Sequence, residues 1–133
     1  MATGDRIKGR FQHYGVLIVP IELNGINLDF MVDSGASFCG ISSKVAKRMG
    51  LKTNKNQSVY VAPAFGELKP VNFTIVNKMK VGIHEVKKII LTILDFPKEV
   101  HYHGLLGMNF LRNFRFTIEP DTATLVLRKI PKT

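Results

Sequence analysis

The sequence predicts a mostly β fold in which antiparallel strands outnumber two short helices. Apolar residues recur at every second position in several segments, which is the period of a strand with one buried face. The dipeptide Asn24-Gly25 stands between two such segments and is a strong short-range signal for a hairpin. No two strand-like segments show the helical spacer that a parallel βαβ unit needs. The length of 133 residues predicts one domain over residues 1–133.

The N-terminal part predicts a hairpin that ends in a carboxylate. Residues 6–13 are expected to form an early strand or arm. The segments Val16–Leu23 and Ile26–Val32 are expected to pair antiparallel through Asn24-Gly25. Alternation places one apolar face on the second segment, with Ile26, Leu28, Phe30 and Val32. The same parity puts Asp33 on the other side of the strand, at its end, where the chain must turn.

A short strand and a helix are expected next. Residues 38–42 are strand-like, and an apolar stripe over residues 44–49 predicts a short helix. Ser42 or Ser43 can cap the start of this helix, and Gly50 can end it.

The central part predicts a hairpin that follows a polar loop over residues 52–58. Two extended arms, residues 59–62 and 71–76, flank a glycine-containing turn at residues 63–68. Such a hairpin is either an ordinary surface feature or a mobile cover over a site.

The C-terminal part predicts further strands and a second short helix. Strands are expected at 79–83, 86–94, 115–119 and 124–129, and Leu105-Leu106-Gly107 predicts a short buried strand before a helix. The loop at 95–103 holds His101 and His103. These two side chains could share one face of a strand, but no third metal ligand is near them in the sequence, so surface histidines and no metal are expected.

Composition and charge argue against several classes of function. A hydrophobic content of 45% suits a packed core. The formal net charge is +9, but the basic residues are dispersed and no run reaches the five or six like charges of a binding tail. We therefore expect no nucleic-acid site, and no cofactor is expected either.

The sequence also limits contact with membranes and redox chemistry. The longest apolar stretch, residues 16–21, is too short to span a bilayer, and residues 1–9 are too polar for a signal peptide. A membrane would be reached only through a segment absent from this chain, so the location stays open between the cytoplasm and a soluble domain of a longer, anchored protein. Cys39 is the only cysteine, which excludes an internal disulfide and predicts a small buried residue.

The most informative stretch is an acidic residue at a strand end, followed by small residues. Asp33 is followed by Ser34, Gly35 and Ala36. Ser34 can hydrogen-bond neighbouring backbone, and Gly35 permits unusual backbone angles or a close approach of another segment. A carboxylate on such a rigid loop can be presented to a substrate. The alternative is an ordinary turn, because Asp, Ser and Gly are common turn residues.

Three segments together resemble the retropepsin-like aspartic proteases. Val32-Asp33-Ser34-Gly35-Ala36 matches the family's hydrophobic-Asp-Thr/Ser-Gly-Ala signature. The stretch Ala64, Phe65, Gly66 and Glu67 lies where the family has its flap tip. Leu105-Leu106-Gly107 with the following Met108-Asn109-Phe110-Leu111 is similar to the family's apolar-apolar-Gly segment and closing helix, and looks closest to domains of bacterial proteins and retroelement polyproteins. By element order the resemblance covers roughly residues 15–127, the expected core of the domain.

The resemblance implies a closed β-barrel of the acid-protease type and an aspartic endopeptidase active as a homodimer. Peptide hydrolysis in this class uses two carboxylates that share one proton, and this chain supplies only Asp33. A second copy would supply the other carboxylate across a twofold axis. The resemblance further assigns the active-site loop to Ser34, Gly35 and Ala36, the flap over a peptide or protein substrate to Ala64, Phe65, Gly66 and Glu67, and loop support to Leu105, Leu106 and Gly107.

Two alternatives of other classes stay open at this point. The same fold could serve only for dimerisation or peptide binding, although such a role needs no carboxylate at Asp33. A small basic β-barrel that binds nucleic acid is the other, but the sparse aromatic residues and dispersed lysines are not typical of such a surface.

Overall fold

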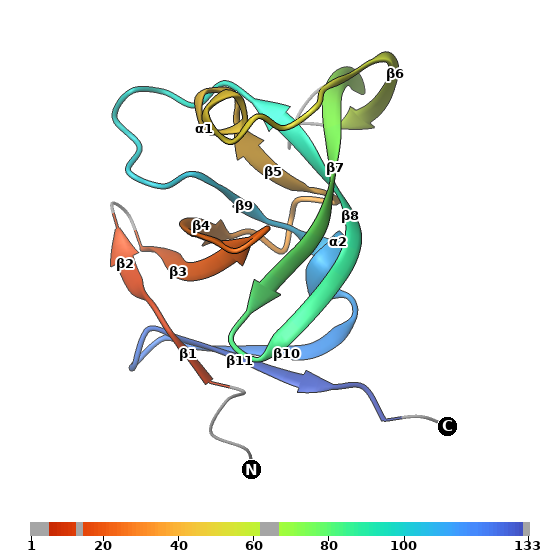
Figure 1. The fold of residues 1–133 in the computed structure, drawn as a ribbon. Coiled ribbons are helices and arrows are strands. Elements are labelled where there is room, and N and C mark those ends of the chain that lie inside the picture. The colour runs from red at the N-terminus through yellow and green to blue at the C-terminus, as the bar shows by residue number, and fades with distance from the viewer. Residues whose placement is uncertain (1–5, 13–14, 62–66, 132–133) are drawn as a thin grey trace.

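The computed structural model describes residues 6–12, 15–61 and 67–131 (Figure 1). The predicted mostly β fold with two short helices is confirmed in this part of the chain. The strands are β1 (Arg6–Lys8), β2 (Arg10–Gln12), β3 (Val16–Leu23), β4 (Ile26–Val32), β5 (Cys39–Ser42), β6 (Asn54–Val61), β7 (Lys69–Val81), β8 (His84–Leu94), β9 (Gly104–Leu106), β10 (Phe114–Glu119) and β11 (Thr124–Lys129), and the helices are α1 (Ser43–Met49) and α2 (Met108–Leu111).

The larger sheet returns on itself. Its strand order is β2-β3-β4-β9-β5-β8-β7-β6, and β3 also pairs with β7 through Glu22–Lys80 and Leu23–Met79. The pairings therefore form a ring of β3, β4, β9, β5, β8 and β7, which is the arrangement that the predicted barrel needs.

The first hairpin forms as predicted. β3 and β4 pair antiparallel in register from Ile18–Met31 to Leu23–Ile26. Asn24 and Gly25 have φ angles of 48° and 83°, so both turn residues occupy the left-handed region that a two-residue hairpin turn of this type requires. Asn24 also fixes the turn on β7, because its N–H donates to the carbonyl of Lys78 (2.9 Å) and its Oδ1 accepts from the Lys78 N–H (3.2 Å).

The helix α1 begins and ends close to the predicted residues. Gly50 follows it with a φ of 69°, which ends the helix as expected. Ser42 is the N-cap residue, but its side chain makes no capping hydrogen bond. Ser43 instead donates its hydroxyl to Asp95 Oδ1 (2.5 Å) and so ties α1 to the loop after β8.

The central hairpin is longer than predicted. The prediction of a polar loop over residues 52–58 is wrong from Asn54 onward, because β6 begins there and pairs with β7. The register shifts between Asn54 and Val59, an irregularity that hides the strand from a period-two search. The segments predicted separately at 71–76 and 79–83 belong mainly to one strand, β7. It runs unbroken from Lys69 to Val81, because β8 pairs with it along most of its length.

Two strand pairs are parallel, which the sequence did not indicate. β4 pairs with β9, and β5 pairs with β8. β9 also pairs antiparallel with β5, so it lies between β4 and β5, two strands that are neighbours in the chain. No βαβ pattern in the sequence indicates these parallel pairs, because their strands are far apart in the chain.

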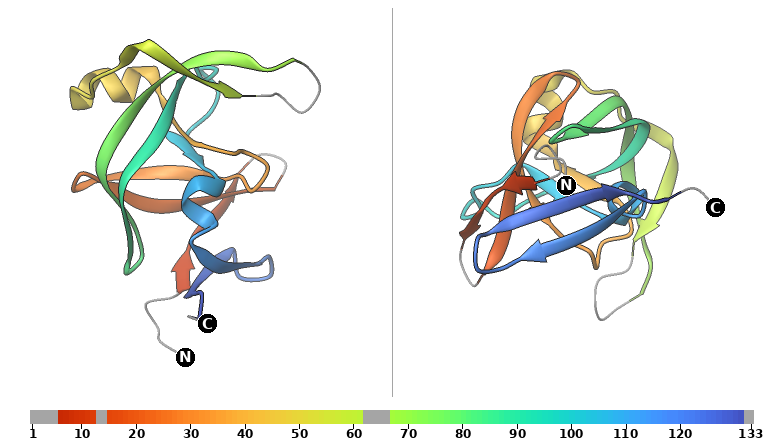
Figure 2. Two further views of the ribbon diagram at one scale, coloured as in Figure 1. Left: turned by 90° about the vertical axis from the view of Figure 1, so that its right-hand side faces the viewer. Right: turned by 90° about the horizontal axis from the view of Figure 1, so that it is seen from below.

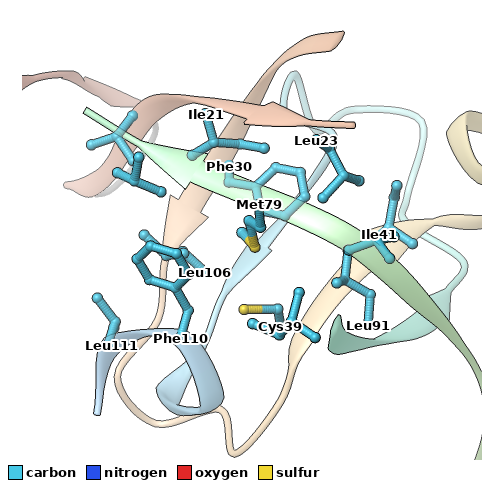
Figure 3. Close-up of a cluster of buried hydrophobic side chains, with 14 of the residues drawn as sticks. Ile21, Leu23, Phe30, Cys39, Ile41, Met79, Leu91, Leu106, Phe110 and Leu111 are labelled. Atoms are coloured by element: carbon cyan, nitrogen blue, oxygen red, sulfur yellow. The ribbon is translucent and has the colours of Figure 1, made fainter. Parts of the chain in front are cut away.

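The core lies inside this ring. Phe30 from β4, Met79 from β7 and Leu106 from β9 are fully buried and converge with Phe110 from α2 (Figure 3). Other strands contribute Ile21, Leu23, Cys39, Ile41 and Leu91 to the same cluster. In the described part of the chain, no helix is long and apolar enough to cross a membrane.

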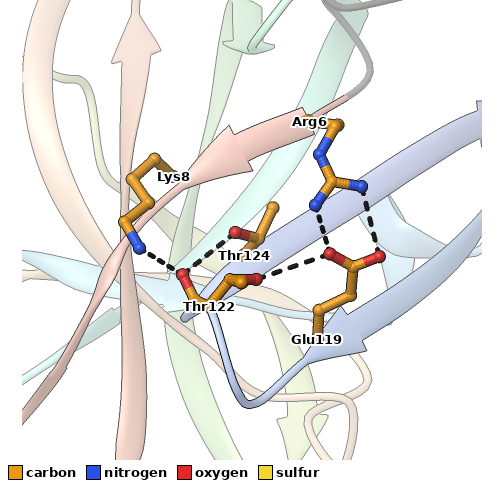
Figure 4. A network of polar contacts seen from close by, with 5 residues as sticks. All are labelled: Arg6, Lys8, Glu119, Thr122 and Thr124. Carbon is orange, nitrogen blue, oxygen red and sulfur yellow. Dashed lines mark hydrogen bonds and ion pairs between the residues drawn. The ribbon is translucent and has the colours of Figure 1, made fainter.

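A smaller sheet of order β1-β11-β10 lies at the end of the molecule opposite β6 (Figures 1 and 2). Its outer face carries a polar network (Figure 4). Arg6 donates to both carboxylate oxygens of Glu119, and the hydrogen bonds from Arg6 lower the pKa of that carboxyl. Lys8 and the Thr124 hydroxyl both donate to the carbonyl of Thr122, the latter at 3.1 Å, which joins β1 to the turn between β10 and β11.

Residues on the apolar face of β4 differ widely in burial. Phe30 is fully buried, whereas Ile26, beside the turn, is 46% exposed, contrary to the alternation prediction. We expect Phe30→Ala to lower the free energy of unfolding by about 3–5 kcal/mol, and Ile26→Ala to change it by less than about 1 kcal/mol. Urea unfolding of both variants tests this, and equal losses would contradict the burial described for β4.

Candidate active site

Asp33 lies directly after β4 in a loop closed by hydrogen bonds. Its backbone N–H donates to the carbonyl of Leu106 (3.0 Å), which ties the loop to β9. The Gly35 N–H donates to Asp33 Oδ1 (3.1 Å), and the Ala36 N–H donates to the Asp33 carbonyl (3.1 Å). The carboxylate therefore has a set orientation, and with Ser34 and Gly35 exposed beside it, it can meet a ligand or a second chain.

Gly35 does not play the local role expected of it. Its φ lies outside the left-handed region, and a Cβ placed there would lie 3.4 Å from Asp33 Oδ1, an ordinary contact. Nothing in the described part of the chain therefore requires glycine at this position. A requirement for glycine would have to come from a molecule that approaches the loop from outside.

Gly107 packs against the backbone that follows Asp33. A Cβ at Gly107 would lie 2.5 Å from the carbonyl oxygen of Phe38 and 2.9 Å from that of Ala36, closer than real Cβ atoms approach. Its N–H meets Cys39 Sγ at 3.3 Å. The absence of a side chain thus lets the start of α2 pack directly on the backbone that follows Asp33.

Asn109 is a second support that sequence reasoning did not single out. Its Oδ1 accepts from the Cys39 N–H (2.7 Å), and its Nδ2 donates to the carbonyl of Ile90 (2.8 Å). Its own N–H donates to the carbonyl of Ser37 (3.1 Å). The Asn109 side chain thus joins β5 to β8, and its main chain adds the Asp33 loop. The available signal was a polar residue inside the apolar run Met108-Asn109-Phe110-Leu111.

A cavity of about 340 Å³ lies between the loop and the central hairpin. It brings together the predicted active-site loop, the arms of the hairpin and Leu105 of β9. All of its lining residues are uncharged: Gly35, Ala36, Ser37, Phe38, Tyr60, Val61, Leu68, Thr92 and Leu105.

The other predicted site residues are placed as follows. Leu106 is fully buried beneath the loop, and Glu67 is exposed at the end of the hairpin. Ala64, Phe65 and Gly66 lie outside the described residues, so their assignment to a flap tip stays a prediction.

Tyr102 is a neighbour of Asp33 that the sequence did not reveal. It is half-buried and packs edge-on against Phe96, with 5.7 Å between the ring centroids. Burial raises the pKa of Tyr102, and the negative charge of Asp33 raises it further. The charge of Asp33 therefore reaches this hydroxyl on the loop before β9.

Other nucleophiles and metal ligands do not form a competing site among the described residues. Cys39 is buried, and loss of solvation raises the pKa of its thiol to about 12, which opposes formation of a reactive thiolate. No three His, Cys, Asp or Glu side chains gather there to hold a metal ion. His103 is not the free surface histidine that was expected, since it is half-buried and its Nδ1 accepts from the Asp29 N–H (3.0 Å).

Comparison with known sequences identifies relatives. A model of the gag-polyprotein putative aspartyl protease family matches residues 19–113. DNA damage-inducible protein 1 of Kluyveromyces lactis is 30% identical over 111 residues. This match covers 82% of the present chain and 25% of that protein, so the chain spans about a quarter of the length of this curated relative.

Comparison with solved structures identifies the fold. A retropepsin-like aspartic protease from Rickettsia conorii has a TM-score of 0.67 at 24% identity, covering 92% of this chain and 89% of that one. The retroviral protease-like domain of Ddi1 from Leishmania major gives 0.55 at 16% identity, covering 87% and 94%. EIAV protease in complex with the inhibitor HBY-793 gives 0.56 at 15% identity, covering 77% and 91%. The predicted retropepsin-like fold is thereby confirmed.

The contrast between two glycines of the site can be measured. We expect Gly107→Ala to lower the free energy of unfolding by about 1–3 kcal/mol, because a methyl group there overlaps two carbonyl oxygens. Gly35→Ala should change it by less than about 1 kcal/mol, because the added methyl group would make only an ordinary contact and the backbone angle is ordinary. Urea unfolding followed by circular dichroism compares the two. A Gly107→Ala protein as stable as Gly35→Ala would show that the described packing is wrong.

Proposed function

The chain belongs to the gag-polyprotein putative aspartyl protease family, and on this premise we propose that it is an aspartic endopeptidase whose active form is a homodimer. The observation that carries the proposal is the geometry of Asp33. Its carboxylate is oriented by the Gly35 N–H, its backbone is held by Leu106, and its loop borders an uncharged cavity. A mere dimerisation module has no need of an oriented, accessible carboxylate.

A second chain completes the proposed site. Two carboxylates a few ångströms apart cannot both ionise, so they hold a single proton between them and act as a base and an acid together. The present chain offers one such carboxylate, at Asp33, and an isologous dimer would place the two Asp33 loops face to face. This arrangement also supplies a reason for Gly35, whose space is open within one chain. Ser34, exposed in the same loop, would hydrogen-bond across or around the pair.

The proposed reaction follows from the shared proton. A water molecule between the two carboxylates gives a proton to the ionised Asp33 while its oxygen attacks the peptide carbonyl carbon. The other Asp33, which holds the shared proton at the start, gives that proton to the carbonyl oxygen, and a neutral diol forms. As the carbon–nitrogen bond breaks, a carboxyl group protonates the leaving amine and the other carboxylate accepts a diol proton. The products are a carboxylic acid and an amine, and the pair again holds one proton.

The cavity supports an extended peptide with an apolar side chain as the substrate. Its lining includes Phe38, Tyr60, Leu68 and Leu105, and it contains no charged residue that would bind a charged side chain. The central hairpin would close over the peptide, with Ala64, Phe65, Gly66 and Glu67 at its tip, and main-chain hydrogen bonds would hold the peptide as an added strand.

We expect Asp33→Asn to abolish cleavage of a mixed peptide library while leaving the fold intact, because an amide is nearly isosteric but cannot take a proton from water. Asp121→Asn is the matched control, since it makes the same chemical change at an exposed turn of the smaller sheet. Cleavage by the purified Asp33→Asn protein at the wild-type rate would overturn the proposal. A wild-type protein that binds peptides without cleaving them would instead favour the binding-module alternative.

We expect added Asp33→Asn protein to inhibit the wild-type protein, because mixed dimers hold only one Asp33 carboxylate and are inactive. With free exchange of subunits, about a ninefold excess of the variant should reduce activity to about one tenth. Each chain carries a net charge of +9, so added salt should aid assembly by screening the repulsion. Activity that does not change as the variant is added would mean that one chain suffices. Excess Asp121→Asn protein serves as the control and should not inhibit.

A further inference from the structure

Immediately before β9, His103 is bonded to Asp29 of β4 by its main chain and by its side chain. The His103 N–H donates to the carbonyl of Asp29 (2.7 Å), a bond between opposed residues that lies just outside the parallel ladder of β4 and β9. The Asp29 N–H donates in turn to Nδ1 of the His103 imidazole (3.0 Å), and this side-chain bond is called the rung. The carbonyl of His103 meanwhile accepts from the Ser42 N–H on β5 (2.9 Å). His103 thus fastens β9 to both of its neighbours.

This rung depends on the protonation of the ring. A neutral imidazole can accept at Nδ1, whereas a protonated imidazole carries N–H groups at both nitrogens and cannot accept. Protonation would therefore set an N–H against the Asp29 N–H. The two main-chain bonds of His103 do not depend on the charge of the ring, so only the side-chain rung is lost in acid.

The surroundings of the ring contain few charges. The ring contacts the backbone of Asp29. The carboxylate of the same residue forms an ion pair with Arg10 of β2 (3.3 Å). On its own loop His103 has His101 and Tyr102 as titratable neighbours. From β5 it meets the backbone of Ser42. A small cavity of about 120 Å³ beside the ring is otherwise lined by Pro20, Asn27 and Leu28, which are uncharged.

The rung lies at one end of the short pairing that holds the candidate site. β9 pairs with β4 over only three residues, Gly104 to Leu106, and at the other end the carbonyl of Leu106 accepts from the Asp33 N–H. Between them Leu105 lines the uncharged cavity. A shift of β9 along β4 would therefore move both the wall of the cavity and the backbone that holds Asp33.

We propose that His103 is a positioning residue that keeps β9 in register with β4 while its ring is neutral, so that acid loosens the wall of the substrate cavity. The rung is present while the ring is neutral and is lost when the ring becomes protonated. A carboxylate pair works in acid. Loss of the rung in acid would limit the reaction there by weakening substrate binding, and would leave the chemical step unchanged. The catalytic part of the inference rests on the proposed function, whereas the rung itself does not.

The first test does not require catalysis. Hydrogen exchange of the Asp29 amide, followed by NMR between pH 7.5 and 5 and corrected for intrinsic exchange, reports the rung, while the ring signals of His103 report its charge. We expect protection of this amide to fall roughly three- to tenfold as the ring becomes protonated. In His103→Asn an amide oxygen can take the place of Nδ1, so protection should stay constant with pH. In His103→Leu it should be low throughout. Wild-type protection that stays constant while the ring titrates would overturn the proposal.

The second test separates binding from chemistry. As the pH falls, KM of the wild-type protein for a cleaved peptide should rise with the protonation of His103, and His103→Asn should remove this rise while leaving the pH dependence of kcat. His101→Asn, a change two residues away in the same loop, should keep the wild-type profile. A KM profile in His103→Asn identical to that of the wild type would overturn the positioning role. A wild-type protein with no peptidase activity but a pH-dependent Asp29 rung would refute the proposed function and leave the rung established.

Discussion

The candidate site depends on the close main-chain packing between the Asp33 loop and the segment that enters α2. Gly107 brings its backbone against the carbonyls of Ala36 and Phe38, at distances that leave no room for a side chain. The Met108 N–H donates to the Ala36 carbonyl (2.8 Å), and Leu106 accepts from the Asp33 N–H. Because these contacts join backbone to backbone, the loop that carries the carboxylate is held by groups that cannot change rotamer.

Burial around the site is uneven from one residue to the next. Leu106 is fully buried, while Leu105, the next residue on the same strand, faces the cavity. Alternation along a strand thus gives β9 two roles, with one side chain in the core and the other in the wall of the site. Asn109 extends the support to β8 through its side-chain amide. The site is therefore built on strands and one short helix, with the central hairpin as its other wall.

Features that depend on neighbouring residues could be predicted from the sequence. The hairpin at Asn24-Gly25 needs two left-handed residues, and that dipeptide is among the few that adopt them at low cost. Gly50 ends α1 for a similar reason. The position of Asp33 at the end of β4 followed from simple alternation, although Ile26, at the start of the same apolar face, is half-exposed because it lies beside the turn.

Features that depend on distant partners could not be predicted. The contacts of Asn109 and His103 join segments many residues apart, and neither residue type is distinctive by itself. The early start of β6 was hidden by the irregular register between Asn54 and Val59. The parallel pairs of β4 with β9 and β5 with β8 leave no local pattern, because each strand is short and its partner lies far along the chain.

The placement of β9 between β4 and β5 has a consequence for the order of folding. During synthesis β4 and β5 emerge well before β9, which fills the space between them. Until Gly104–Leu106 has left the ribosome, both strands carry an unpaired edge, and such edges attract other extended chains. Closing so long a loop makes assembly of this sheet slow. The nascent chain therefore passes through a stage in which the strand that leads to Asp33 has an edge open to wrong partners.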